Sequence, residues 1–148
     1  MRKRVMVGMI ILVFSGMAVA ENRPERIMDI PVFNTTSIDL TRFNKDLAAA
    51  VKANEAWVSD PVSIALWLAE EFEGKEQHII QVNNVADGPD KARVIILRDG
   101  YLDDSIRGER FEINLELSKK GDWMVKDAKK AWRCWEERRP GFTSDFCP

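Results

Sequence analysis

The sequence predicts an α+β fold in which N-terminal helices pack on a curved antiparallel sheet of about four strands. Apolar residues recur at helical spacing between positions 41 and 73, and strand-like segments follow one another from position 77 onwards. Helices that precede a run of strands favour an antiparallel sheet with the helices on one face. We expect a single domain, because the sequence contains no internal repeat and no interdomain linker.

Residues 1–20 have the pattern of a cleaved signal peptide. The basic start Arg2-Lys3-Arg4 precedes an almost wholly apolar run that ends in Ala18-Val19-Ala20, a small-x-small cleavage site. A membrane-spanning anchor is the alternative, but the apolar run is short for a bilayer span. A lipoprotein-type anchor is not indicated, because no Cys follows the predicted cleavage site. We therefore expect a periplasmic or secreted domain, residues 21–148, with no stable membrane anchor.

The charge balance of the mature chain argues against one class of partner. Residues 21–148 keep 19 of the 22 basic residues against 24 acidic ones, a formal charge of −5. A general nucleic-acid binder needs a clear basic excess. We therefore expect no nucleic-acid partner.

Two helices are expected after an irregular lead-in over residues 21–39. The first begins near Thr41, with apolar residues at i, i+4 and i+8: Phe43, Leu47 and Val51. The second begins at Asp60, which can cap free amide groups, and continues with Pro61 at the first helical position. Gly74 is the expected stop of this second helix.

Four strands are expected after the helices. The first spans Gln77–Val85 in a mixed pattern, and the second is the apolar run Ala92–Leu97. Residues 110–118 alternate between polar and apolar side chains, which is typical of a strand with one buried and one wet face. A glycine-containing turn then leads to a strand that opens with Trp123. We expect Trp123, like Trp67 on the second helix, to lie in the core.

The two cysteines, Cys134 and Cys147, most simply form one disulfide in an oxidising compartment. Closing a loop of about 14 residues stabilises the fold by roughly 3 kcal/mol in the chain-entropy model. A metal site is not expected, because His78 is the only imidazole, and a thioredoxin-like role is not expected without C-x-x-C. No cofactor is indicated.

The connection between the second and third strands, residues 99–110, is rich in charged groups. Asp103 and Asp104 could offer oxygens to a hard cation, but their spacing does not match an EF-hand loop. The simpler interpretation is a loop tied by Asp–Arg ion pairs, with Gly108 at a bulge or turn. Asp103, Asp104 and Arg107 of this loop are nevertheless candidate binding residues.

A cluster of Trp and Arg residues near the C-terminus is the best candidate binding surface. Both residue types are enriched at binding hot spots. The alternative, which we favour, is that the rings pack on the disulfide and cover the end of the sheet. The candidate binding residues of this cluster are Trp132, Arg133, Trp135, Arg138 and Arg139.

Signals for catalysis are poor. No nucleophile–base arrangement with the single His can be read from the sequence, and the common hydrolase, zinc-protease and phosphate-loop motifs do not occur. An acid pair such as Asp103 and Glu109 could serve in glycoside cleavage, but any acidic loop offers as much.

One stretch carries a resemblance. The run L-D-D-S-I-R-G-E-R-F, residues 102–111, is followed by spaced residues that complete the pattern: Trp123, Ala128, Trp132, Cys134 and Cys147. This pattern resembles a set of small secreted proteobacterial proteins of uncharacterised function. The resemblance implies an exported domain with a disulfide-closed tail, and no activity. The expected architecture is also similar to cystatin-like and NTF2-like cones, which include enzymes, ligand binders and inhibitors.

The leading hypothesis is a non-catalytic exported binding module that engages a protein or an envelope component. An inhibitor of a secreted hydrolase is one alternative, motivated by small size, export and a disulfide. A small-ligand-binding or enzymatic cone is the other, motivated by the fold analogy alone.

Overall fold

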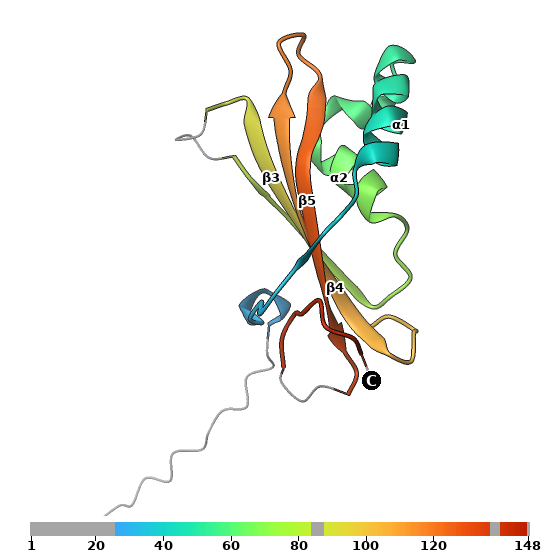
Figure 1. Cartoon of the computed structure of the whole chain (residues 1–148), viewed down its shortest axis with the longest axis vertical. Coiled ribbons are helices and arrows are strands. Elements are labelled where there is room, and N and C mark those ends of the chain that lie inside the picture. The colour runs from blue at the N-terminus through green and yellow to red at the C-terminus, as the bar shows by residue number, and fades with distance from the viewer. Residues whose placement is uncertain (1–25, 84–87, 137–139, 148) are drawn as a thin grey trace, which may run out of the picture.

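The computed structural model describes residues 26–83, 88–136 and 140–147; the expected signal peptide lies outside them. Two helices lie on one face of a five-stranded antiparallel open sheet, which confirms the α+β class (Figure 1). The strand order in the sheet is β1-β5-β4-β3-β2. In chain order the elements are η1 (Ile27–Asp29), β1 (Thr36–Ser37), α1 (Thr41–Lys52), η2 (Ala56–Ser59), α2 (Pro61–Ala69), β2 (Glu76–Val82), β3 (Lys91–Asp99), β4 (Ile106–Leu117) and β5 (Trp123–Cys134).

The sheet has five strands rather than four because the lead-in contributes one. Thr36 and Ser37 pair with Lys130 and Lys129 on the outer edge of β5. Two residues are too few to show a period-two alternation. The lead-in is therefore irregular only in part, and it covers an edge that would otherwise be open.

The start of α2 follows the sequence signal. Asp60 Oδ1 accepts hydrogen bonds from the backbone N–H groups of Val62 and Ser63, both at 3.0 Å. The Ser63 hydroxyl and amide contribute most to holding the pKa of Asp60 below its usual value. Pro61 occupies the first helical position, as expected.

The end of α2 differs from the expectation. The helix ends at Ala69, before Gly74, and Glu70 leaves it with φ +60°. Arg98 of β3, only 2% exposed, donates from Nη1 to Ala69 O at 2.6 Å and from Nη2 to Glu70 O at 2.7 Å. Its Nε donates to Gln77 Oε1 at 2.9 Å. A residue far along the chain therefore caps this helix, which local signals could not predict.

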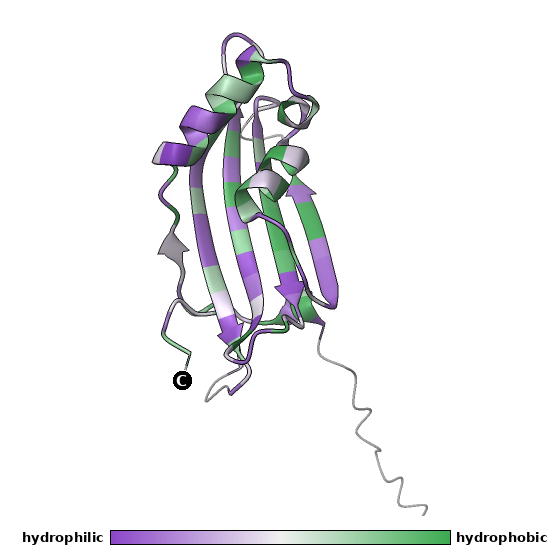
Figure 2. Cartoon of the chain, turned by 90° about the vertical axis from the view of Figure 1, so that its right-hand side faces the viewer, coloured by the Kyte–Doolittle hydropathy of each residue, from purple (hydrophilic) through white to green (hydrophobic). Residues whose placement is uncertain are grey.

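The main core lies between the helices and the sheet, and Figure 2 shows the helices lying over the strands. Trp123 packs partly buried against this core, but Trp67 is exposed and stacks on Trp57 at 4.8 Å between ring centroids. The expectation of a core position for Trp67 is wrong. The buried members of the core are Leu47, Ile64, Ala65, Ala69, Val94, Ile96, Phe111, Ile113, Leu115, Val125 and Ala128.

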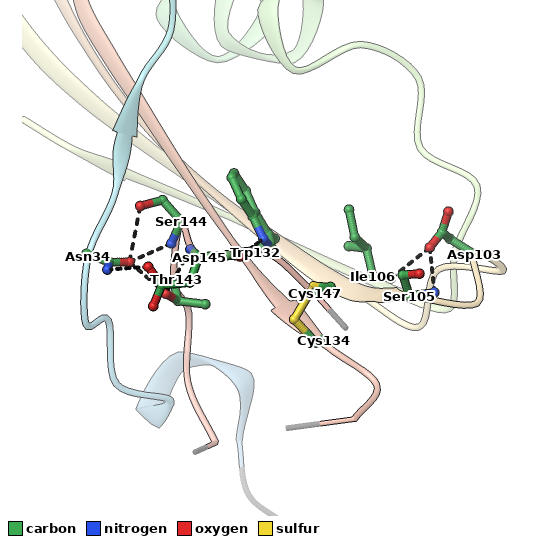
Figure 3. Close-up of a disulfide and its surroundings, with 10 residues drawn as sticks. All are labelled: Asn34, Asp103, Ser105, Ile106, Trp132, Cys134, Thr143, Ser144, Asp145 and Cys147. Atoms are coloured by element: carbon green, nitrogen blue, oxygen red, sulfur yellow. Dashed lines mark hydrogen bonds between the residues drawn. A yellow bond between two sulfur atoms is a disulfide. The ribbon is translucent and has the colours of Figure 1, made fainter. Parts of the chain in front are cut away.

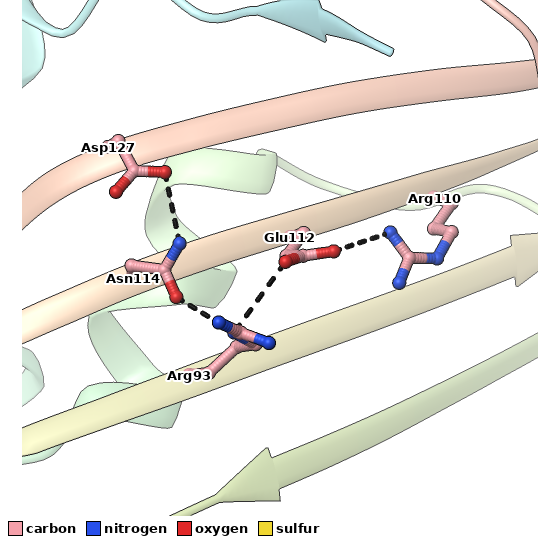
Figure 4. A network of polar contacts seen from close by, with 5 residues as sticks. All are labelled: Arg93, Arg110, Glu112, Asn114 and Asp127. Atoms are coloured by element: carbon pink, nitrogen blue, oxygen red, sulfur yellow. Dashed lines mark hydrogen bonds and ion pairs between the residues drawn. The ribbon is translucent and has the colours of Figure 1, made fainter. Parts of the chain in front are cut away.

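The opposite face of the sheet, here called the open face, is covered by neither α1 nor α2. At its centre Arg93 lies 3.5 Å from Glu112 and donates to Asn114 at 2.9 Å, Arg110 donates to Glu112 at 3.0 Å, and Asn114 donates to Asp127 at 3.0 Å (Figure 4). Cross-strand charge pairs of this kind suit a solvated sheet surface. In the part of the chain that the structure describes, no helix is long and apolar enough to cross a bilayer.

Candidate binding site

The disulfide holds the C-terminal tail at the end of β5. Cys134 and Cys147 are bonded, with an S–S distance of 2.09 Å, as the sequence predicts. Asn34 of the N-terminal segment accepts from Thr143 Oγ1 at 2.7 Å and from the Ser144 amide at 2.5 Å (Figure 3). The two ends of the described chain therefore meet at this end of the sheet, which we call the disulfide end.

The two terminal segments cover the lower part of the open face. Phe33 N–H donates to Phe142 O, and Phe142 N–H donates to Pro31 O, both at 2.8 Å. Phe142 is fully buried, and it packs in one cluster with the buried residues Ile27 and Ile30 of the N-terminal segment. This small second core anchors the segment that contains η1 against the strands.

Asp103 organises the loop between β3 and β4. Its Oδ1 accepts from the amides of Ile106 at 2.7 Å and Ser105 at 2.8 Å (Figure 3). These bonds, the one from Ile106 first, hold the pKa of Asp103 below its usual value. Asp104 is exposed in the same loop. Within the described residues no group of three or more His, Cys, Asp or Glu could hold a metal ion.

Trp135 joins this loop to the end of β5. Its backbone N–H donates to Ser105 O at 3.0 Å, and its indole Nε1 donates to Asp103 O at 2.8 Å. The guanidinium of Arg107 lies over the indole ring, 5.4 Å from its centroid. The residue is nevertheless 44% exposed, so Trp135 is held in place while it remains accessible to solvent.

Two further large apolar side chains are exposed at the disulfide end. Leu102, 82% exposed, precedes the Asp103 that binds the indole, and Phe146, 92% exposed, precedes the Cys147 bonded to Cys134. We call Leu102, Trp135 and Phe146 the apolar rim. Exposed apolar groups gathered at one place mark interaction sites more often than isolated ones do.

A pocket of about 480 Å³ lies between the segment around η1 and the open face. We call it the terminal pocket. Three of its lining residues, Glu76, Asp99 and Arg133, belong to one cross-strand row. In this row Gly108 of β4 is the register partner of both Asp99 and Arg133. The other lining residues are Arg26, Ile27, Met28, Ile30, His78 and Arg107.

Gly108 makes the close packing of this row possible. A Cβ at this position would lie 2.5 Å from Arg98 O, 3.0 Å from Asp99 Oδ1 and 3.3 Å from Arg133 Cγ. Any side chain would therefore push Asp99 and Arg133 apart. Arg133 is only 3% exposed, so the row places a guanidinium close to fully buried at the pocket floor.

Arg107 enters the pocket because the β4–β5 register shifts between Ile106 and Gly108. Its Nε lies 3.2 Å from Asp99 Oδ1, and its Nη2 lies 3.4 Å from Asp99 Oδ2. The bulge therefore turns Arg107 to contact Asp99 on one side and the Trp135 ring on the other. The loop is therefore tied by an Asp–Arg ion pair, as the simpler interpretation of the sequence predicts, and the pair is Asp99–Arg107.

On β2, Glu76 and His78 point to the same face because they are two residues apart. His78 Nε2 and Glu76 Oε1 are 2.5 Å apart in a hydrogen bond. Sequence reasoning considered His78 alone and missed Glu76 and Asp99 as site residues. The period-two spacing of Glu76 and His78 is visible in the sequence, but the pairing of Glu76 on β2 with Asp99 at the end of β3 is not.

The structure brings together some of the residues proposed from sequence and separates others. Arg107, Arg133, Trp135 and Asp103 meet at the disulfide end. Trp132 lies on the helix-bearing face, because successive strand residues alternate; its Nε1 donates to Asp145 O at 2.8 Å. Two other candidates, Arg138 and Arg139, lie outside the described residues.

Comparison of the chain with known protein families, curated proteins and solved structures gives no match. The resemblance to small secreted proteobacterial proteins and to cystatin-like and NTF2-like cones therefore stays a prediction.

Proposed function

We propose that this protein is an exported, non-catalytic binding module that engages a protein of the cell envelope or its surroundings with its disulfide end. The observation that carries the proposal is the apolar rim: Leu102, Trp135 and Phe146 are exposed together on a part of the fold that is firmly held. An exposed leucine alone would mean little, but three large apolar side chains at one end argue for a partner.

The scaffold beneath the rim supports a recognition role. The Cys134–Cys147 disulfide, the indole hydrogen bond to Asp103 O and the Arg107–Trp135 stacking each restrict motion before any partner arrives. A surface that is ordered in advance loses less conformational entropy on binding. Trp and Arg are also the residue types that most often dominate binding energy.

Export is part of the proposal. It is supported by the signal-peptide pattern of residues 1–20 and by the disulfide, which suits an oxidising compartment. An inhibitor of a secreted hydrolase would be one form of the same function, because such an inhibitor is also a protein-binding module. Loss of enzyme activity in the captured complex would identify that form.

The test places a photo-cross-linking benzophenone side chain at position 102 of the mature protein. The matched control places it at Lys119, in the exposed turn between β4 and β5 at the other end of the sheet (Figure 1). We expect one defined cross-linked partner from position 102 in the native envelope fraction and none from position 119. Excess unlabelled wild-type domain should suppress this product, because it competes for the same partner.

A competitor variant links the result to the rim. The double substitution Leu102→Ser/Phe146→Ser should fold normally, since both side chains are exposed, yet fail to suppress the cross-link. Equal cross-linking from positions 102 and 119, or equal competition by the variant, would refute the proposal.

A further inference from the structure

We infer that the protein forms a symmetric dimer in which the edge strand β2 pairs antiparallel with β2 of a second copy. β2 is the last strand in the order β1-β5-β4-β3-β2, so no strand of the described chain pairs with its outer side. At the opposite edge, β1 covers part of β5. An uncovered edge offers a row of backbone N–H and C=O groups to another strand. The inference goes beyond the proposed function, because it concerns a different part of the fold.

The hydrogen bonds of β3 show which backbone groups of β2 point away from the sheet. Gly100 N–H, directly after β3, donates to Arg107 O at 2.8 Å, so even-numbered residues of β3 face β4 and odd-numbered ones face β2. The register of β3 with both neighbours is continuous, and its odd-numbered residues pair with even-numbered residues of β2. The backbone groups that point outwards therefore belong to Gln77, Ile79 and Gln81.

β2 lacks the features that usually keep a sheet edge from pairing. It contains neither proline nor lysine, and its register with β3 runs from Glu76 to Val82 without a bulge. The three residues whose backbone points outwards are all exposed, and the middle one, Ile79, is 40% exposed. This exposure leaves the outer side of β2 accessible to an added strand.

The edge is complementary to itself, which favours a second copy as the occupant. When Ile79 lies opposite Ile79 of the second copy, Gln77 of each copy lies opposite Gln81 of the other. All three outward-facing residues then meet in hydrogen-bonded pairs, and each pair exchanges both N–H···O bonds. A shift in either direction would leave at least one of the three without a partner in β2. The register also places Glu76 opposite Val82, so no like charges face each other.

The side-chain amides on the helix-bearing side complement the same register. Gln77 Oε1 accepts from Arg98 Nε at 2.9 Å, so the NH₂ group of Gln77 remains to donate. Gln81 Nε2 donates to Asn83 Oδ1 at 2.9 Å, so the side-chain oxygen of Gln81 remains to accept. Opposite residues of antiparallel strands share a face, so Gln77 of one copy can donate to Gln81 of the other. The two Ile79 side chains meet between these amide pairs.

The symmetry axis turns the disulfide ends of the two copies in opposite directions. β2 begins at the disulfide end, where Glu76 lines the terminal pocket, and antiparallel pairing reverses its direction in the second copy. The dimer joins two five-stranded sheets into one and presents an apolar rim at each end of the joined sheet.

The test traps the register with single cysteines introduced into the mature protein. Opposite residues of a hydrogen-bonded antiparallel pair have Cα atoms about 5.5 Å apart, which matches the Cα–Cα distance of 5.5 Å in the native disulfide. Under mild oxidation, Ile79→Cys should form a covalent dimer by itself. Gln77→Cys and Gln81→Cys should each stay monomeric alone, because position 77 faces position 81, but a mixture of the two variants should form a mixed dimer.

Sedimentation equilibrium measures the same dimer without a cross-link. The average mass of the wild type should rise with concentration. Ile79→Lys places two ammonium groups opposite each other at the axis and should weaken dimerisation about tenfold. The matched control is Met124→Lys, which adds the same charge at an exposed apolar position of β5 and should dimerise as the wild type does. Urea unfolding of both variants confirms that they fold.

Three results would each overturn the inference: a constant monomer mass, a covalent dimer of Gln77→Cys alone as readily as of Ile79→Cys, or equal weakening by Met124→Lys. A monomer whose position 79 cross-links to a different envelope protein would also overturn it, because a strand of that protein would then occupy the edge. Dimerisation is measured with the isolated protein. Its failure therefore leaves the cross-link at position 102 in place, and loss of that cross-link leaves the dimer in place.

Discussion

Two arginines buried to almost the same degree lie on opposite faces of the sheet, and their surroundings differ. Arg98 is 2% exposed and Arg133 is 3% exposed. They sit in adjacent cross-strand rows, one row containing Gln77, Arg98 and Glu109, the other Asp99, Gly108 and Arg133. What differs is the layer above each of them.

On the helix-bearing face, the contacts of Arg98 are structural. Its donors contact the last carbonyls of α2 and Gln77, and its guanidinium lies 5.2 Å and 5.4 Å from the ring centroids of Phe72 and Phe111. On the open face, Arg133 lies at the floor of a pocket. The comparison teaches that burial of a charge does not by itself tell whether α2 covers an arginine, as it covers Arg98, or whether the arginine lines a pocket, as Arg133 does.

The largest effect on stability is expected for Arg98→Met. This substitution leaves the carbonyls of Ala69 and Glu70 without their donor, and each loss costs about 1–3 kcal/mol. We expect the free energy of unfolding to fall by about 4 kcal/mol in total. Urea unfolding of the variant beside Arg93→Met, an exposed arginine of the open face, measures this difference. Equal losses in the two variants would show that Arg98 does not hold the helix.

Removal of the disulfide should have the next largest effect. The variant Cys134→Ser/Cys147→Ser loses a cross-link between residues 13 apart in sequence, which costs about 3 kcal/mol in the chain-entropy model. The disruption should be local to the disulfide end. We expect amide exchange to accelerate at Thr143 and Ser144 while Val94 and Ile113, in the helix-side core, stay protected under native conditions. Uniform acceleration over both regions would mean that the two faces unfold together.

A smaller effect is expected at the start of α2. Asp60→Ala should cost about 1 kcal/mol at pH 7 because two amides lose their acceptor. The pKa of Asp60 is lower in the folded state than in the unfolded chain. The stabilisation is therefore complete above about pH 4 and is lost as the pH falls through the folded value. Unfolding of the wild type and of Asp60→Ala between pH 7 and pH 2 should show that the difference in their free energies of unfolding shrinks as the pH falls. A constant difference would contradict the capping role.

The smallest effect concerns Tyr101, which lies beside Arg98. Burial, and then the hydrogen bond to Glu109, raise the pKa of Tyr101 to about 12. Since the chain has one tyrosine, absorbance of the tyrosinate reports this residue alone. The native protein should titrate near 12 and the urea-unfolded protein near 10. The stabilising contribution is present below pH 10 and is lost as the pH rises towards 12.

The contrast between the helix-bearing face and the open face can be sharpened with the same probe. Arg98 opposes the upward shift of the Tyr101 pKa, so Arg98→Met should raise that pKa further. Arg107→Gln, on the open face, should leave it unchanged. An equal change of the Tyr101 pKa in both variants would mean that charges on the open face act on Tyr101 as strongly as Arg98 does.

Local patterns were sufficient for most of the fold. The N-cap pair Asp60-Pro61, the alternation in β4 and the two cysteines each determine structure within a few residues, and each expectation is confirmed. The misses are non-local. The end of α2 depends on Arg98, which is about thirty positions further on, and the strand β1 exists only because β5 offers it an edge.

The candidate site was predictable only in composition. Arg107, Arg133 and Trp135 could be singled out as residue types suited to binding, but their meeting depends on a bulge in β4. Trp132 and Arg133 are adjacent in sequence, and strand alternation sends them to opposite faces. The row that forms the pocket floor needs the register of four strands, which no single segment encodes.

The contact between Asn34 and residues 143–145 has a consequence for the order of assembly. Asn34 and Ser144 are 110 positions apart, so the N-terminal segment has no partner there until nearly all of the chain has been made or delivered. The helices and central strands can associate earlier, because their contacts are closer in sequence. The disulfide end is therefore the last region to mature, and a chain that stops before residue 142 would keep the scaffold while lacking the Asn34 contacts and the Phe142 packing beneath η1.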